Sequence, residues 1–153
     1  MIKVLFVCHG NICRSPMAEF IFKDTVRKAG LEKRYEIHSA ATSTEEIGNG
    51  LYPHAARCLD AHGIPYSAHR ATQLKKSDYS EYDFIIGMDG ENMQNMLRLF
   101  GKDPDDKVRS LLSFAGSSRF IADPWYTRDF ETAYNDIVEG CEALLNATKN
   151  GLS

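Results

Sequence analysis

Residues 2–16 of the chain read IKVLFVCHGNICRSP in one-letter code. The apolar run Val4–Val7 predicts a buried strand of a parallel sheet, because such strands are covered on both faces and show no polar alternation. Pro16 is favoured in the first turn of a helix, where no amide hydrogen is needed. Residues 8–15 are therefore predicted to form a loop that leaves the carboxyl end of a strand and enters a helix.

The residues of this loop suit attack on a phosphate ester. Its successive backbone N–H groups can converge on an anion, and the positive end of the following helix adds to their effect. Arg14 offers a planar fork of donors for two phosphate oxygens. These surroundings favour the thiolate of Cys8, the predicted nucleophile, and Ser15 can donate a hydrogen bond to it. The predicted phosphate-binding residues are His9, Gly10, Asn11, Ile12, Cys13 and Arg14.

The alternative interpretation of the same residues is an ordinary strand-to-helix turn with two incidental cysteines. A bare cysteine and arginine six positions apart would not decide between the two. The strand before the loop, the Ser-Pro pair after it, and Gly10 and Asn11, which tolerate unusual backbone angles, favour the phosphate loop.

The stretch Val7–Glu19 resembles the signature of the low-molecular-weight protein tyrosine phosphatases, and the likeness covers the whole chain. It extends to residues 123–126, Asp-Pro-Trp-Tyr, which are similar to the family's acid loop. The resemblance implies that Cys8 is the nucleophile, Arg14 the phosphate binder and Asp123 the general acid and base. The implied activity is hydrolysis of protein phosphotyrosine through a phosphocysteine intermediate. His9 departs from the family, where a leucine or threonine is more usual.

A general acid is needed because a phenoxide, whose conjugate acid has a pKa of about 10, departs slowly unless a proton arrives with it. Pro124 stiffens the segment around Asp123, and Trp125 and Tyr126 could flank a substrate ring. The alternative is a turn before a helix, which Asp-Pro commonly opens.

The resemblance also implies roles in shaping the loop. The family uses an asparagine at the position of Asn11 to hold the loop, braced by residues that match Ser39 and His69. The family commonly has a glycine within residues 39–42, which this chain lacks. An exposed loop histidine is the alternative interpretation of His69. Asp89 resembles a structural aspartate of the family and is predicted to cap the helix that follows it.

Two loop residues carry further predictions. Ile12 can project into the pocket wall opposite Trp125 and Tyr126, which would form a slot for phosphotyrosine. Related enzymes that remove phosphate from arginine resemble this chain but carry a threonine at this position. Cys13 is close enough to Cys8 in a tight cup for a reversible, protective disulfide. The alternative is that Cys13 only packs behind the loop.

The remainder of the chain alternates strand and helix patterns. Strands are predicted at residues 35–40, 83–88 and 108–112, a short extended piece at 66–68, and helices after the loop, at 54–62, at 91–100 and near the C-terminus. This pattern predicts a single α/β domain, residues 1–153, with an open twisted parallel sheet of about four strands and helices on both faces. The resemblance implies the strand order 2-1-3-4. The polar residues 42–46 follow the second strand and are a candidate pocket rim, with a plain solvent loop as the alternative.

Composition limits the partners. The net charge of −3 and the pI near 5.9 argue against nucleic acid as the main partner. The N-terminal apolar run is too short for a membrane span and lacks the features of a secretory signal, so we expect a cytoplasmic monomer without a membrane partner. The cysteines at 8, 13, 58 and 141 show no C-x2-C pair and no histidine spacing suited to zinc. Cys58 and Cys141 are predicted to pack in the core, and no metal or cofactor is expected.

Two other functions fit a phosphate-cupping α/β domain. A thiol-dependent arsenate reductase needs redox cysteines that relay a disulfide to the surface, and this chain has no cysteine between Cys58 and Cys141. A non-enzymatic anion-binding module has no use for a nucleophile, an arginine and an aspartate together. We therefore expect tyrosine-phosphorylated proteins as substrates, and phosphate or other oxyanions as inhibitors.

Overall fold

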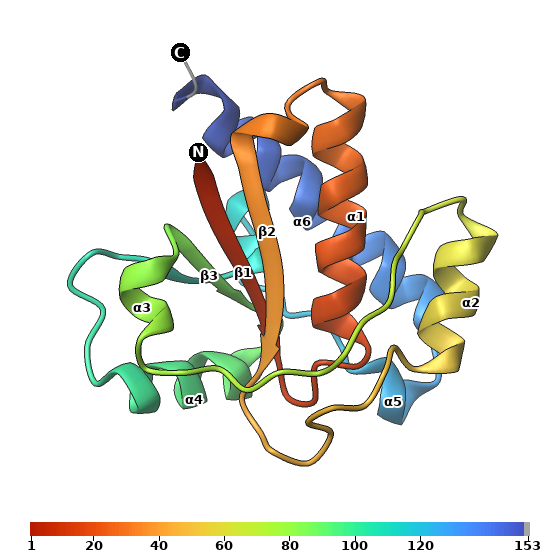
Figure 1. Ribbon diagram of the computed structural model, residues 1–153, viewed down its shortest axis with the longest axis horizontal. Coiled ribbons are helices and arrows are strands. Elements are labelled where there is room, and N and C mark those ends of the chain that lie inside the picture. Colours follow the sequence, from red (N-terminus) through yellow and green to blue (C-terminus); the bar gives the residue numbers. More distant parts are fainter. Residues whose placement is uncertain (152–153) are drawn as a thin grey trace.

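The computed structural model of the protein describes residues 1–151 and has a four-stranded sheet at its centre (Figure 1). All pairings are parallel, and the strand order is β2-β1-β3-β4. The strands are β1 (Ile2–Cys8), β2 (Tyr35–Ala41), β3 (Phe84–Gly87) and β4 (Val108–Ser110). The predicted sheet and its predicted order are confirmed.

The helices follow the predicted alternation, with shifted ends. They are α1 (Arg14–Lys28), α2 (Pro53–Ala61), α3 (Asp78–Glu81), α4 (Gly90–Phe100), α5 (Pro124–Thr127) and α6 (Phe130–Thr148), with 3₁₀ turns at Glu32–Arg34, Leu111–Ala115 and Lys149–Gly151. The one-turn helices α3 and α5 have too few residues to show a periodic pattern and were not predicted.

Two predicted extended segments differ from the structure. β4 ends at Ser110, because Leu111 begins the 3₁₀ turn that packs beneath α6. Residues 66–68 form no strand. The extended contact of this region lies further along, where Gln73 makes an isolated parallel bridge to Ala41.

Helices cover both faces of the sheet. In Figure 1, α1 and α6 lie on one face, while α3 and α4 lie on the other. Successive residues of β1 point to opposite faces, so Phe6 joins the core beneath α1 and α6, and Leu5 and Val7 join a smaller core beneath α4. All three are at most 2% exposed, which accounts for the unbroken apolar run in the sequence.

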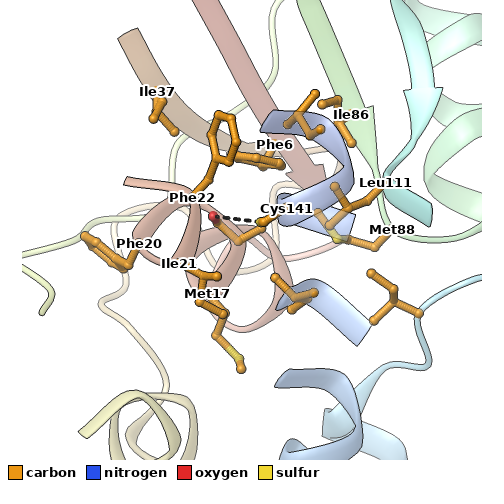
Figure 2. Packing of buried hydrophobic residues seen from close by; sticks show 14 of the residues in the cluster. Phe6, Met17, Phe20, Ile21, Phe22, Ile37, Ile86, Met88, Leu111 and Cys141 are labelled. Carbon is orange, nitrogen blue, oxygen red and sulfur yellow. Dashed lines mark hydrogen bonds between the residues drawn. The ribbon is translucent and has the colours of Figure 1, made fainter. Parts of the chain in front are cut away.

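The larger core is continuous from the sheet into α6. Figure 2 shows Phe6, Phe22 and Ile86 gathered around the helix, with Cys141 beside α1. Cys141 is fully buried, and its thiol lies 3.9 Å from the Ala18 carbonyl. The predicted core position of Cys141 is confirmed.

The crossovers explain where a ligand can bind. β1 is followed by α1 on one face of the sheet, whereas β3 is followed by α4 on the other. Connections that leave adjacent central strands in opposite directions open a crevice at the carboxyl ends of those strands. Cys8 is the last residue of β1, and α5 approaches the same end of the sheet in Figure 1.

One close contact fixes α6 on the sheet. Gly140 is buried on the face of α6 that meets Leu111. A Cβ atom at Gly140 would overlap the Cγ atom of Leu111 and lie 3.0 and 3.1 Å from its two Cδ atoms.

Among residues 1–151, no helix combines the length and the apolar character that crossing a bilayer would take.

Candidate active site

The thiol of Cys8 lies at the base of a loop formed by residues 9–13. Cys8 is 3% exposed. Its Sγ atom lies 3.0 Å from the Ser15 hydroxyl oxygen and accepts a hydrogen bond from the Asn11 N–H at 3.3 Å. Both groups can donate a hydrogen bond to this sulfur, and together they fix its position.

The carbonyl groups of the loop point away from the centre. Each of five loop carbonyls accepts a hydrogen bond from outside the pocket. The donors are Thr42 N–H to Cys8, Ser43 N–H to His9, His69 Nε2 to Asn11, Tyr52 N–H to Ile12, and Met17 N–H to Cys13. In a trans peptide the C=O and the following N–H point in opposite directions. The N–H groups of His9, Gly10, Ile12 and Cys13 therefore face the other way, and no hydrogen bond within residues 1–151 uses them. This row of free donors can receive an oxyanion.

Asn11 holds the curve of the loop. It is fully buried and has a left-handed backbone with φ of 58°. Its side-chain Nδ2 donates to the Ser15 hydroxyl at 2.8 Å, and its Oδ1 accepts from the Thr72 N–H at 3.1 Å. His69 donates through Nε2 to the Asn11 carbonyl at 2.7 Å. The side chain of Asn11 is therefore used inside the wall, and only its neighbours line the pocket.

Ser39 reaches this set of contacts only through its backbone, because its carbonyl accepts from the Thr72 hydroxyl at 3.3 Å. The Ser39 hydroxyl donates to Glu19 Oε1 at 2.6 Å, and no hydrogen bond within the described residues joins Ser39 to His69 or to the side chain of Asn11. Glu19 is only 8% exposed, and a buried carboxylate needs donors of its own. The contact expected of Ser39 is made instead by the backbone of Thr72, which the sequence did not indicate.

Arg14 is held by one edge of its guanidinium. It is 2% exposed, and its Nη1 donates to Asp89 Oδ2 at 2.7 Å and to the Ile121 carbonyl at 2.9 Å. Burial by itself lowers the pKa of Arg14, but the negative charges of Cys8, Asp89 and Asp123 outweigh burial, and the pKa is raised above its usual value. Arg14 therefore stays charged.

Asp89 caps α4, as predicted, and also accepts a hydrogen bond from Arg14. Its Oδ1 accepts from the Asn92 N–H at 2.9 Å, in a reciprocal capping box at the start of α4. Its other oxygen accepts from Arg14, so the same carboxylate fixes the helix and orients the guanidinium.

Asp123 reaches the pocket from the far end of the sequence. Its Oδ2 lies 3.4 Å from Arg14 Nη2, and its Oδ1 accepts from the Trp125 N–H at 3.0 Å. Asp123 thus caps the short helix α5 and also faces the pocket. The turn before a helix is therefore present, and the same residue places its carboxylate beside Arg14; the acid role of Asp123 stays a prediction.

The pocket walls are apolar and aromatic, and one rim is acidic. Ile12 lines the pocket together with Trp125 and Tyr126, which are 41% and 80% exposed. Glu45 and Glu46 complete the rim from the loop after β2. His9 is drawn to this rim, with its Nε2 3.1 Å from Glu45 Oε2. Of the candidate rim at residues 42–46, Glu45 and Glu46 line the pocket.

Cys13 lines the pocket but is chemically quiet in the resting structure. It is 5% exposed. Burial, and then the negative charges of Cys8 and Asp123, raise the pKa of Cys13 well above its usual value. Its thiol therefore stays protonated at neutral pH, and none of the four cysteines takes part in a disulfide bond.

The fold and the pocket place the protein in the class of cysteine-dependent phosphatases. The family model described as low molecular weight phosphotyrosine protein phosphatase matches residues 3–152, and the chain belongs to this family. Low molecular weight phosphotyrosine protein phosphatase 1 of Drosophila melanogaster is 41% identical over 94% of this chain and 94% of its own length. The crystal structure of YfkJ from Bacillus subtilis has a TM-score of 0.95, with 37% identity over 100% of this chain and 98% of that chain. The structure of DARP, a Drosophila arginine phosphatase, has a TM-score of 0.86, with 32% identity over 97% of this chain and 98% of that chain.

Proposed function

We propose that the protein, as a single phosphatase domain over residues 1–153, hydrolyses phosphotyrosine in proteins through a phosphocysteine at Cys8. The observation that carries this proposal is the position of the Cys8 thiol, 3.0 Å from the Ser15 hydroxyl, in one pocket with Arg14 and Asp123. Membership of the phosphotyrosine phosphatase family supports it.

The first step transfers the phosphoryl group to sulfur. The phosphate binds against the free N–H groups of the loop and replaces the Asp123 carboxylate at Nη2 of Arg14, the side of the guanidinium that Asp89 and the Ile121 carbonyl do not use. Asp123 takes up a proton from solvent when the phosphate replaces it beside Arg14. The Cys8 thiolate then attacks phosphorus, the bond from phosphorus to the tyrosine oxygen breaks, and Asp123 gives that proton to the oxygen. Asp89 and the Ile121 carbonyl keep the guanidinium in place while charge moves across the phosphoryl oxygens.

The second step returns the enzyme to its starting state. Asp123, now a carboxylate, takes a proton from a water molecule as the water attacks phosphorus. The phosphorus–sulfur bond breaks, and phosphate leaves. The departing thiolate is stabilised by the Ser15 hydroxyl and the Asn11 N–H, the two groups that contact it in the resting structure. Every proton and ligand role is filled by the chain's own groups, so no metal or cofactor is required.

The walls of the pocket favour a flat aromatic ester. The branched side chain of Ile12 packs on one side of the substrate ring, and Trp125 and Tyr126 flank the other. Phosphoserine is too short to bring its backbone past these walls. Free phosphate and similar oxyanions would compete for the same loop as inhibitors.

The test is hydrolysis of a chromogenic aryl phosphate and of a phosphotyrosine peptide. We expect turnover by the wild type, no turnover by Cys8→Ser, and full activity in the presence of a metal chelator. Quenching the wild-type reaction with radiolabelled substrate should trap acid-stable phosphate on a thiol of the peptide that contains Cys8. Activity that survives Cys8→Ser, or label on another residue, would refute the mechanism.

A further inference from the structure

A second group of chemically active side chains lies outside the pocket. No metal-ligand cluster is expected from the cysteine spacing, but the fold brings Cys58 of α2, His62 at the end of α2 and Glu131 of α6 together. Sγ, a ring nitrogen and a carboxylate oxygen all lie within 4.8 Å of one another. Cys58 and His62 are four residues apart, which is one helical turn and was a usable signal in the sequence. Glu131 is contributed by a distant segment that sequence spacing does not reveal.

We propose that Cys58, His62 and Glu131 form a zinc site that joins α2 to α6. Zinc accepts thiolate, imidazole and carboxylate ligands, and sites with three protein ligands leave the fourth position to water. Magnesium and calcium prefer oxygen ligands throughout, so the thiol and the imidazole select against them.

The distances require only a small adjustment. His62 Nε2 lies 2.6 Å from Glu131 Oε1, and Cys58 Sγ lies 3.9 Å from the same oxygen. Bonds of about 2.0 to 2.3 Å to a tetrahedral zinc ion place ligand atoms roughly 3.3 to 3.8 Å apart. The distance between His62 Nε2 and Glu131 Oε1 must therefore increase by about 0.7 Å, and the thiol must move slightly inward.

The surroundings hold the ligands in this arrangement. The His62 ring stacks on Tyr134, with centroids 3.7 Å apart and planes 8° apart, so its orientation is fixed. Cys58 is 7% exposed, while the side chains of His62 and Glu131 are 30% and 60% exposed. The ion can therefore enter from solvent, and within the described residues Glu131 has no ion-pair partner other than His62.

Zinc binding must remove the proton of the Cys58 thiol. Burial and the nearby Glu131 charge raise the pKa of the Cys58 thiol to about 11, so this thiol is protonated in the metal-free protein. When zinc binds, the sulfur–hydrogen bond is replaced by a sulfur–zinc bond and the proton passes to solvent. No electron is transferred.

The test is metal binding to the full chain in a Cys8→Ser, Cys13→Ser background, which removes the pocket thiols as competing ligands. Titration with Zn²⁺ and with Co²⁺ should show one site, and the Co²⁺ form should have the charge-transfer absorption of a cobalt–thiolate bond. Mg²⁺ should not compete. Cys58→Ala, His62→Gln and Glu131→Gln should each weaken binding, with about 100-fold loss for the thiol.

Matched controls separate this site from adventitious binding. His54→Gln changes an exposed histidine of α2, and Glu142→Gln changes an exposed glutamate of α6. Both should keep the affinity of the background protein. Because Cys58 is buried, His62→Gln provides an exposed substitution that tests the site without changing the core. Unchanged binding in His62→Gln and Glu131→Gln, no thiolate band, or equal loss in the controls would overturn the proposal.

Discussion

Asn11 shows how much of the pocket one residue can determine. Its left-handed backbone aims its N–H at Cys8, its carbonyl at His69, and its side chain at Ser15 and Thr72. Asparagine is among the few residues that adopt this backbone at low cost. The neighbouring Gly10 has no positive φ, and a Cβ there would make an ordinary contact with the Glu46 side chain at 3.4 Å, so the unusual backbone angle of the loop is carried by Asn11.

The clearest residue-scale prediction concerns Asp123. Asp123→Asn should slow hydrolysis of phosphate esters with poor leaving groups by about 10²-fold, and that of activated aryl phosphates much less, because only poor leaving groups need the proton. Asparagine also caps helices well, so α5 should remain formed. Steady-state kinetics over a series of substituted phenyl phosphates measures the effect. Asp105→Asn, at an exposed and remote position, is the control. Equal loss with all leaving groups would assign the acid role to another carboxylate.

Ile12 is the predicted selector of the phosphoester. Ile12→Thr should raise the ratio of kcat/KM for phosphoarginine to that for phosphotyrosine by about 10-fold, the scale of one apolar contact. The substitution removes the branched contact with the ring and introduces a hydroxyl that can accept from a guanidinium. Ile47→Thr makes the same change on the neighbouring loop, outside the pocket lining, and should leave the ratio unchanged. A wild type that already prefers phosphoarginine would contradict the proposal that these walls form a slot for phosphotyrosine.

Cys13 is predicted to protect oxidised Cys8 by forming a reversible disulfide with it. Peroxide takes two electrons from the Cys8 thiolate and leaves a sulfenic acid; Cys13 then attacks that sulfur, water leaves, and a disulfide forms. Loss of the Cys8 negative charge removes one cause of the raised pKa of Cys13 and so eases the attack. After peroxide and then excess thiol, the wild type should regain most of its activity and Cys13→Ser much less. Equal recovery would show that Cys13 only packs behind the loop.

At the scale of elements, the contact between α6 and the 3₁₀ turn Leu111–Ala115 determines how the closing helix sits. Gly140→Ala should lower the free energy of unfolding by about 1 to 2 kcal/mol, because overpacking against the fully buried Leu111 outweighs the helix propensity gained. Denaturant unfolding monitored by circular dichroism measures it. Asn135→Ala on the exposed face of α6 should be neutral or stabilising. A stabilised Gly140→Ala would mean that Leu111 can move aside.

Elements with strong local patterns could be predicted from the sequence, and those defined by distant contacts could not. The apolar runs of β1 and β3 and the periodic helices are intrinsic to their segments, and so is the cup between Cys8 and Ser15. The end of β4, by contrast, depends on how Leu111 packs beneath α6. The same limit applies to the site. Whether Ser39 contacts His69 or Glu19 depends on where α1 places a buried carboxylate, and no local pattern records that.

At the scale of the whole molecule, the proposed nucleophile and the proposed acid come from distant parts of the chain. Cys8 lies at the end of the central strand, which is hydrogen-bonded on both sides by β2 and β3. Asp123 lies between the 3₁₀ turn Leu111–Ala115 and α6, directly before α5. The proposed catalytic set is therefore complete only when the C-terminal third has packed onto the sheet.

The acidic rim has a kinetic consequence. Glu45 and Glu46 stand at the mouth of a pocket built for an anion, on a protein of net charge −3. At low ionic strength these charges repel a free dianion before it reaches Arg14, and they attract a phosphotyrosine flanked by lysine or arginine. Raising potassium chloride from roughly 10 to 150 mM shortens the Debye length from about 30 to 8 Å.

Over that range, kcat/KM should rise about twofold for a small aryl phosphate and fall for a basic phosphopeptide, as encounter rates respond to screening in opposite directions. Stopped-flow measurement at limiting substrate compares the two. In a Glu45→Gln, Glu46→Gln protein both slopes should flatten. If neither substrate responds to salt, the rim has no part in choosing substrates; if the slopes have the predicted signs, the enzyme discriminates among phosphoproteins before any bond to phosphorus changes.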